Sequence, residues 1–308
     1  RSPLLNGFKS SMMSQAPDQK TPIVSVVIPT NNRKEWVTEA LESVFAQTYQ
    51  NFEVIVVDDG SKDGTSEHLR EHYGERIRLF RTEGTNCPTA KNFGTSHALG
   101  KYIGFLDDDD LWYPQKLEKQ VAYLEAAPDH VAMVGSGCDH IDRDGNPFWK
   151  PNIPENRLDY RTACIEPRLP GASSGSLIKK SVFDEFNGFD LSLTRNQDRD
   201  LWIKLTRKYE VHLIPEVLST VRVHGGERRG ITIDLIRDCR LTINSRIPEA
   251  GIRRQANAWT HFHLFNLYWR CSRRKSLFHL VLSFLIYPLP LPVDRNRTKV
   301  VIKKFLNR

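Results

Sequence analysis

The chain has 308 residues, which suits one large domain or a domain with a substantial appendage. With 39% hydrophobic and 26% charged residues, its composition is that of a soluble globular protein. A net charge of +7 and a pI near 9.1 favour acidic partners, such as nucleotides, phosphorylated lipids, an anionic membrane surface or nucleic acid. The five cysteines are widely spaced without a C-x-x-C pair, which favours free thiols in a reducing compartment over a disulfide framework.

The first 20 residues lack the apolar stretch of a secretory signal. We therefore expect residues 1–20 to be a disordered leader, or residues added for expression, and the protein to be cytoplasmic. They are left out of the prediction of the fold.

Strand and helix patterns alternate along the first third of the chain. Continuous β-branched runs such as IVSVVIP predict strands buried on both faces, and apolar residues at helical spacing in KEWVTEALESVFAQ predict a helix. Repeated strand–helix–strand units predict a mainly parallel sheet covered by helices. The expected strands span residues 23–29, 52–59, 77–82 and 101–107, and the expected helices span residues 34–47, 65–74 and 89–100.

Two familiar phosphate-binding patterns are absent from the sequence. No G-x-G-x-x-G follows the first strand, which argues against a dinucleotide-binding domain. The stretch GTSHALGKY has five residues between its glycines and Tyr102 in place of Ser or Thr, so it does not match a P-loop. We interpret it as the end of a helix with Gly100 as the cap.

Polar loops follow three of the predicted strands: PTNNR after the first, DDGS after the second and DDDD after the fourth. In a parallel sheet the carboxyl ends of the strands meet at one edge, where ligands bind. The run Asp107 to Asp110 could be a solvated loop tip, because charge runs usually are, or a cation site that neutralises clustered carboxylates. Its position at a strand end favours the cation site.

Six motifs, taken in order, are similar to those of the family 2 glycosyltransferases. They are VSVVIPTNNR, FEVIVVDDGSKDGT, AKNFG, YIGFLDDDDLWYPQKLE, NGFD and NQDRDLWIKL, and they lie between Ile23 and His224. The resemblance implies an α/β GT-A fold, with a mainly parallel Rossmann-like sheet flanked by helices and a C-terminal helical extension. It implies a catalytic domain over residues 21–230, with a nucleotide-binding part to about residue 110 and an acceptor part over 111–230, and an extension over 231–308.

The resemblance also implies a site for a nucleotide-sugar. Asp59 would accept a hydrogen bond from a ring N–H of the base. The chain departs from the family at Asn31, where an aromatic residue is usual, and at Lys91, where arginine is common and the bidentate fork is lost. Outside the acidic run, the residues expected to bind the nucleotide-sugar in the first two strand loops and the third helix are Pro29, Thr30, Asn31, Arg33, Asp58, Asp59 and Lys91.

The run FLDDDDLW resembles the family's D-x-D metal motif. The resemblance makes Asp107 and Asp109 the D-x-D pair, with Asp108 on the ribose and Asp109 as the direct ligand of Mn²⁺ or Mg²⁺. Such hard cations prefer oxygen ligands and bridge them to a diphosphate. We expect Asp110 to be the N-cap of the next helix, with Pro114 in its first turn.

The stretch NQDRDLWIKL resembles the motif that carries the family's general base. Asp198 takes the place of the base, and Gln197 stands where glutamate is more usual. A capping role for Asp198 at the start of a helix is the alternative. Asp200 is expected to be structural, followed by Leu201 and Trp202 facing the core.

The segment VRVHGGERRG resembles the family's mobile lid. The resemblance implies that His224 approaches the metal and that Arg228 and Arg229 contact the diphosphate when the lid closes.

The C-terminal extension is basic and apolar. The run SLFHLVLSFLIYPLPLP is shorter than the ~20 residues of a spanning helix. Two alternatives remain: an interfacial segment that makes peripheral contact with the inner face of an anionic membrane through residues 253–308, or a helical lid on the catalytic domain. His261 and His263 do not share a helix face, so we expect structural roles for both.

The resemblance, together with these residues, predicts a metal-dependent inverting glycosyltransferase. It would move a sugar, most readily from a UDP-sugar, to the hydroxyl of a saccharide or lipid-linked acceptor in polysaccharide or glycolipid assembly. The alternatives are a sugar nucleotidyltransferase, which should carry a glycine-rich phosphate loop, and a nucleotide-sugar binding protein with impaired chemistry. Nucleic acid is not an expected partner, because the predicted crevice is acidic.

Overall fold

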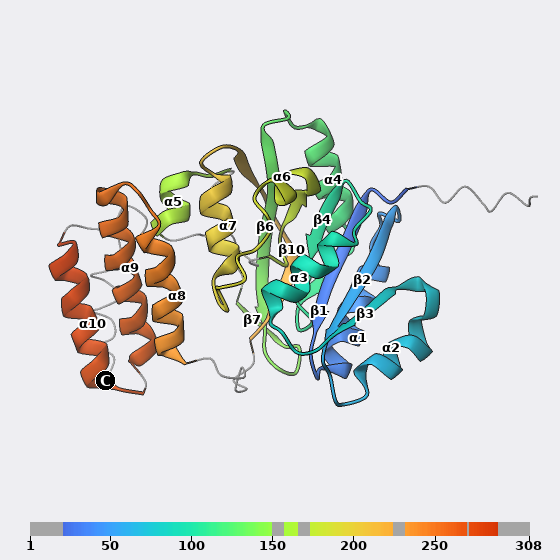
Figure 1. The fold of residues 1–308 in the computed structure, drawn as a ribbon, viewed down its shortest axis with the longest axis horizontal. Coiled ribbons are helices and arrows are strands. Elements are labelled where there is room, and N and C mark those ends of the chain that lie inside the picture. The colour runs from blue at the N-terminus through green and yellow to red at the C-terminus, as the bar shows by residue number, and fades with distance from the viewer. Residues whose placement is uncertain (1–20, 150–156, 166–172, 224–231, 270, 289–308) are drawn as a thin grey trace, which may run out of the picture.

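The computed structural model describes residues 21–149, 157–165, 173–223, 232–269 and 271–288. Within these ranges a single mixed sheet forms the centre of the molecule, with helices on both faces and a group of three helices at one end (Figure 1). The strands along the main path of the sheet follow the order β3-β2-β1-β4-β9-β6-β10-β5.

The first four strands are the predicted ones, and they are parallel to one another. They are β1 (Val24–Thr30), β2 (Phe52–Asp59), β3 (Arg78–Thr82) and β4 (Tyr102–Phe105). All seven residues of β1 are buried, because alternate side chains of this central strand contact helices on opposite faces of the sheet. Thr30 lies opposite Asp58 in the register, so the strands end side by side.

The rest of the sheet is mixed. The long strands β6 (Val131–Ile141) and β10 (Glu210–Arg222) are parallel, and β9 (Leu177–Lys179) runs antiparallel between β4 and β6. Short antiparallel strands pair at the margins: β5 (Leu111–Trp112) and β8 (Arg157–Leu158) with β10, and β7 (Pro147–Trp149) with β6.

Helices α1 and α4 cover one face of the sheet, and α3, α6 and α7 pack on the other. The helices of the sheet region are α1 (Lys34–Phe45), α2 (Thr65–Tyr73), the 3-10 turn η1 (Gly74–Arg76), α3 (Cys87–Ser96), α4 (Lys116–Ala126), α5 (Tyr160–Ile165), α6 (Lys180–Glu185) and α7 (Gln197–Leu205).

The sequence predicts Gly100 as the cap of helix α3, but the structure shows otherwise. The helix ends at Ser96 with His97 as its cap. A β-carbon at Gly100 would lie 2.5 Å from the backbone nitrogen of Ser25, so this glycine allows the chain to pass closely over β1. The physical reason for the difference is therefore close packing between distant segments, which the local pattern does not contain.

The expected C-terminal helices are α8 (Ile233–Ser245), α9 (Ala250–Tyr268) and α10 (Arg273–Ile286). Helix α9 lies between α8 and α10 and also packs on α5, where Ile165 joins a core with Trp259, Phe262 and Phe265 (Figure 1). The helices are thus an integral part of the packed structure. In the described part of the chain, no helix is both long and apolar enough to cross a bilayer.

Candidate functional site

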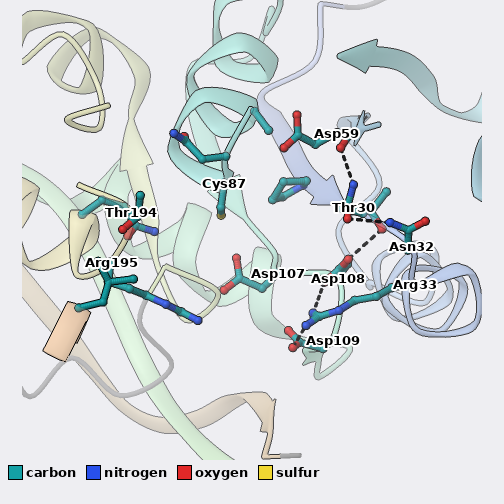
Figure 2. Close-up of a pocket in the computed structure, with 16 residues that line it drawn as sticks. Thr30, Asn32, Arg33, Asp59, Cys87, Asp107, Asp108, Asp109, Thr194 and Arg195 are labelled. Atoms are coloured by element: carbon teal, nitrogen blue, oxygen red, sulfur yellow. Dashed lines mark hydrogen bonds and ion pairs between the residues drawn. The ribbon is translucent and has the colours of Figure 1, made fainter. Parts of the chain in front are cut away.

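The carboxyl ends of β1, β2 and β4 open into a cleft of about 720 Å³ (Figure 2). Its size is that of a small-molecule site. The cleft is lined by Pro29, Thr30, Asn31, Asn32, Arg33, Asp59, Asn86, Cys87, Ala90, Asp107, Asp108, Asp109, Thr194, Arg195, Gln197 and Leu235.

The loop after β1 is tied to the loop after β2 by two asparagines. The Nδ2 of Asn31 donates to the backbone oxygen of Asp59. Asn32 adopts a left-handed conformation with φ of 54°, which asparagine tolerates better than most residues. Its backbone N–H donates to Ser61 and its side-chain oxygen accepts from the N–H of Lys62, at 2.8 and 2.7 Å. These bonds hold the two loops as one wall of the cleft.

The two aspartates after β2 have different surroundings. Asp58 is fully buried and accepts hydrogen bonds from the N–H of Ser61 and from Ser66, with an ion pair to Arg81 at 2.8 Å, so it braces the loop from behind the cleft. Asp59 lines the cleft, and its Oδ1 accepts from Thr82 and from Thr85. In the described residues the bonds to this carboxylate all go to Oδ1, so Oδ2 can accept from a ligand.

The loop after β4 that contains Asp107 to Asp110, the acidic loop, is held by an arginine. Nη1 of Arg33 lies 2.7 Å from Oδ1 of Asp108 and 2.8 Å from Oδ2 of Asp109 (Figure 2). Thr30 donates to the other oxygen of Asp108 at 2.8 Å. Burial, together with the neighbouring charge of Asp109, raises the pKa of Asp108 to about 6 even though Arg33 opposes the shift.

Asp110 is not a helix cap, contrary to the sequence prediction. Helix α4 begins at Lys116 with Gln115 at the cap position. Asp110 is buried instead, and accepts from Ser174 Oγ at 2.6 Å and from the backbone N–H of Arg222 at 3.1 Å. Burial and the adjacent acids raise its pKa well above the usual value. The carboxylate therefore anchors the acidic loop to β10 and to the segment before β9.

Lys91 on α3 lies beneath the other end of the acidic loop. Its ammonium is buried and lies 2.6 Å from Asp107 and 2.7 Å from Ser173 Oγ. The pKa of Lys91 is raised to a value above its usual range, because the attraction of Asp107 outweighs the cost of burial. Lys91 thus supports the cleft through Asp107 and does not line it.

Asp198 lies in the first turn of α7, next to Gln197 of the cleft wall. It is not among the residues that line the cleft, but it is close enough to Asp107 and Lys91 for their charges to act on its pKa. Its own Oδ1 accepts from the N–H of Arg199 at 2.8 Å, and the Asn196 side chain makes no capping bond. Burial raises the pKa of Asp198, with the charge of Asp107 acting in the same direction and Lys91 in the opposite one. Gln197 lines the cleft itself. Asp200 is buried against Lys204 and Arg246, and Leu201 and Trp202 face the core, as the sequence predicted.

Several residues of the cleft were not foreseen. Asn86, Cys87 and Ala90 come from the start of α3, where Asn86 caps the helix by accepting from Thr89 N–H at 2.9 Å. Thr194 and Arg195 line the opposite wall, and Arg195 extends toward the acidic loop in Figure 2. The sequence carried a cap signal for α3, in which Asn86 is followed two residues later by Pro88. It carried none for Leu235 of α8, which reaches the cleft through tertiary packing alone.

The residues of the acidic loop suit a divalent cation that shares its coordination with a ligand. Among the described residues no three His, Cys, Asp or Glu side chains are grouped as a complete metal cage. Mg²⁺ commonly binds through one or two carboxylates plus substrate phosphates, so such a cage is not required. Asp107 and Asp109 offer hard oxygens, and the pKa of Asp108 is raised by burial together with the negative charge of Asp109, which a bound cation would offset. His224, Arg228 and Arg229 lie outside the described residues.

In open α/β sheets, ligands bind beyond the carboxyl ends of the strands, which is where this acidic cleft lies. The profile of Glycosyl transferase family 2 matches residues 25–186, and the chain belongs to this family.

The curated relatives agree with the family. An uncharacterized glycosyltransferase of Rickettsia felis is 36% identical over 211 residues, which are 66% of this chain and 35% of that protein. A Rickettsia typhi relative, also an uncharacterized glycosyltransferase, is 35% identical over 71% of this chain and 69% of its own length. The putative teichuronic acid biosynthesis glycosyltransferase TuaG of Bacillus subtilis is 34% identical over 66% of this chain and 79% of its own. The chain thus spans only about a third of the Rickettsia felis protein.

Solved structures share the fold. Residues 1–349 of TarS from S. aureus, in complex with UDP-GlcNAc, give a TM-score of 0.63 at 17% identity over 85% of this chain and 81% of that one. The mannosyltransferase PcManGT of Pyrobaculum calidifontis, in complex with GDP-Man and Mn²⁺, gives 0.57 at 20% identity over 97% and 92% of the two chains. The fold is therefore the GT-A glycosyltransferase fold, with C-terminal helices added.

Proposed function

We propose that this protein transfers a sugar from a nucleotide-sugar, most readily a UDP-sugar, to an acceptor hydroxyl with inversion at the anomeric carbon. The observation that carries the proposal is the group Asp107 to Asp109 of the acidic loop, which lines a cleft of about 720 Å³ at the carboxyl edge of the sheet. Asp198 adjoins Gln197 of the cleft wall in the sequence and lies close enough to Asp107 for that charge to act on its pKa. The catalytic unit occupies residues 21–230 and the helices after residue 231 form its extension.

The nucleoside lies against the loops after β1 and β2. Oδ2 of Asp59 accepts a ring N–H of the base, Thr30 and Asn31 form the adjacent wall, and Asp108 accepts from the ribose. Asn31 offers no aromatic face, so the base is held by hydrogen bonds there. This arrangement suits uracil, which has a ring N–H, and is supported by the UDP-GlcNAc held by the TarS structure.

The diphosphate lies above the acidic loop. Asp109, with Asp107 beside it, would hold Mn²⁺ or Mg²⁺, which when bound neutralises the charge that develops on the leaving diphosphate. The Mn²⁺ in the PcManGT complex supports this choice of cation. Arg33 and Arg195 are the described cations at the cleft that can approach the phosphates directly. We also propose that His224, Arg228 and Arg229 approach from the lid.

Asp198 acts as the general base. As the acceptor oxygen attacks the anomeric carbon from the face opposite the diphosphate, its proton passes to the carboxylate of Asp198 and the bond to the diphosphate breaks. The raised pKa of Asp198 makes it a better proton acceptor than an ordinary aspartate. The acceptor we propose is a saccharide or a lipid-linked saccharide of polysaccharide or glycolipid assembly, supported by the similarity to TuaG, a putative teichuronic acid biosynthesis glycosyltransferase.

Calorimetric titration tests the donor site. UDP, GDP and dTDP are titrated into the wild type with and without Mn²⁺, and into Asp109→Ala, with Asp144→Ala as a control in the exposed turn before β7. We expect UDP to bind with Mn²⁺, the Asp109 variant to lose at least about tenfold in affinity, and the control to match the wild type. Absence of nucleotide binding under every condition would overturn the proposal, and Mn²⁺-independent binding would remove the cation from it.

A further inference from the structure

Helix α10 carries four large hydrophobic side chains on the outside of the molecule. Leu277, Phe278, Val281 and Leu285 are between 49% and 69% exposed. Val281 follows Leu277 by four residues and Phe278 by three, and Leu285 follows Val281 by four, so the four side chains lie along one stripe of the helix. Helix α10 is the outermost of the C-terminal helices, at the end of the molecule far from β1, β2 and β3 (Figure 1).

The inward face of α10 mixes apolar and polar side chains: Leu280 is buried in the core with Phe284 packed against it, and two serines and a histidine are buried as well. Ser276 donates to the backbone oxygen of Phe265 at 2.9 Å, and Ser283 donates to that of Ala258 at 2.8 Å. His279 is buried as well, with its Nδ1 2.9 Å from Nδ1 of His261. A surface helix normally turns its apolar side inward. Helix α10 carries apolar side chains on both faces, so an additional apolar stripe faces solvent, which marks an interaction surface.

Cations flank this stripe at both ends. Arg273, Arg274 and Lys275 are exposed in the first turn of α10, where the helix dipole favours acids over bases, although Arg273 also stacks on Trp269 and Lys275 approaches the ring of Tyr268. At the opposite end, exposed Arg254 donates to the backbone oxygen of Ile286. Arg274 precedes Leu277 and Phe278 by three and four residues and so lies on the same stripe.

The charge near α10 is not balanced by acids. Helix α10 contains none, and within the described residues no carboxylate lies within ion-pair distance of its three cations. The nearby acids of α8, Asp234 and Asp238, both pair with Arg237 at 2.8 Å. Between residue 250 and the end of the sequence there are twelve Lys and Arg and a single acid, Asp294.

We propose that the outer face of α10 binds the surface of an anionic membrane, with the helix lying in the plane of the interface. An apolar stripe bordered by cations is the composition that such a surface recognises. The helix of 14 residues is about 21 Å long, too short to cross a hydrocarbon core, so it lies along the surface. A second copy of the chain is a poorer occupant, because both ends of the stripe are cationic and any twofold pairing would set cations against cations.

Co-sedimentation of the full chain with vesicles tests this surface. The wild type should bind vesicles of phosphatidylcholine mixed with phosphatidylglycerol, and bind vesicles of phosphatidylcholine alone at least about tenfold less. Leu277→Gln with Leu285→Gln should lower binding at least about tenfold. The matched control is Leu99→Gln with Leu191→Gln, two leucines of similar exposure elsewhere on the surface, which should bind as the wild type does.

A second variant tests the charges. Arg273→Gln with Arg274→Gln should lose about fivefold in binding for each cation, since one cation near an anionic surface contributes about a factor of five. Equal binding to both vesicle types, no binding at all, or equal loss in the leucine control would overturn the proposal. So would a wild-type dimer in light scattering that the Leu277 and Leu285 changes convert to a monomer. UDP titration of the same variants should match the wild type, so failure here is distinguishable from failure of the donor site.

Discussion

At the scale of single residues, the carboxylates in and beside the cleft have different surroundings. Asp108 and Asp109 share Arg33, and Asp107 is paired with Lys91. Asp198 has the N–H of its own helix as its hydrogen-bond partner, and its pKa is raised. Carboxylates with different surroundings are suited to different roles. The roles we propose are cation binding by Asp107 and Asp109 and proton transfer by Asp198.

Replacing Asp198 by Asn should therefore lower kcat by about 10²- to 10⁴-fold while leaving the affinity for UDP unchanged. Because the base acts as a carboxylate, kcat/KM of the wild type should fall as the pH drops through the raised pKa of Asp198. The acidic limb should thus lie above the usual aspartate value of 3.8. Initial rates measured across pH, with exposed Asp184→Asn on α6 as the control, check both expectations. Full activity in the Asp198 variant would place the base elsewhere.

The sequence could predict the residues that follow strands, because the carboxyl ends of parallel strands meet. Thr30, Arg33, Asp59 and the acidic loop are together for that reason. It could not predict Asp110, whose partners Ser174 and Arg222 lie 64 and 112 residues away along the chain. Leu235 likewise enters the cleft only because α8 packs against the domain.

At the scale of elements, the position of α3 controls one wall of the cleft. Gly94 in the last turn of this helix faces the sheet, and a β-carbon there would lie 2.6 Å from Val27 Cγ1 and 3.1 Å from Val57 Cγ2. The glycine lets α3 approach β1 and β2 closely, which sets the height of Ala90 and Lys91 at the cleft. The parallel strands and their helices were predicted from apolar periodicity. The antiparallel insertion of β9 was not, because strand order depends on contacts between segments far apart in the chain.

Gly94→Ala should destabilise the protein by about 1 to 3 kcal/mol, although alanine is the better helix former, because overpacking outweighs propensity here. Gly251→Ala is the matched control. That position in the first turn of α9 has open space around a β-carbon, so the change should be neutral or stabilise by up to about 1 kcal/mol. Urea unfolding of the two variants measures the difference, and equal stability of the two would contradict the close packing of α3.

At the scale of the whole molecule, the C-terminal helices share their core with the catalytic unit. Arg199 on α7 is buried and donates to the backbone oxygen of Cys164 and to Asn244 Oδ1, so one side chain joins α7 to α5 and α8. Burial and the nearby charge of Arg240 lower the pKa of Arg199 to about 9. The residue after the proposed base is thus the connection to the extension. The sequence left two alternatives for the extension, a lid on the catalytic domain or an interfacial segment. Helix α8 contributes Leu235 to the cleft, whereas α10 exposes its apolar stripe at the outside, so different helices of the extension relate to the two alternatives.

Because of this shared core, we expect one cooperative unfolding transition for the whole chain. Phe265→Ala, in the buried core of α9, should lower the stability of that single transition by about 3 to 5 kcal/mol. Phe278→Ala, on the exposed face of α10, should change it by less than about 0.5 kcal/mol. Circular dichroism and tryptophan fluorescence followed together in denaturant check this, and a separate early transition in the Phe265 variant would show that the helices unfold on their own.

The pairing of Arg33 with both Asp108 and Asp109 has a thermodynamic consequence. The guanidinium of Arg33 acts as a counter-ion for the two carboxylates. A divalent cation that binds Asp109 must displace it, so the cation binds less tightly than it would to a free carboxylate. A nucleoside diphosphate offers the displaced guanidinium a new anionic partner. The two ligands should therefore promote each other's binding by the same factor. Mn²⁺ titrated into the protein should then bind more tightly with UDP present than without it, and identical affinities would remove Arg33 from this exchange.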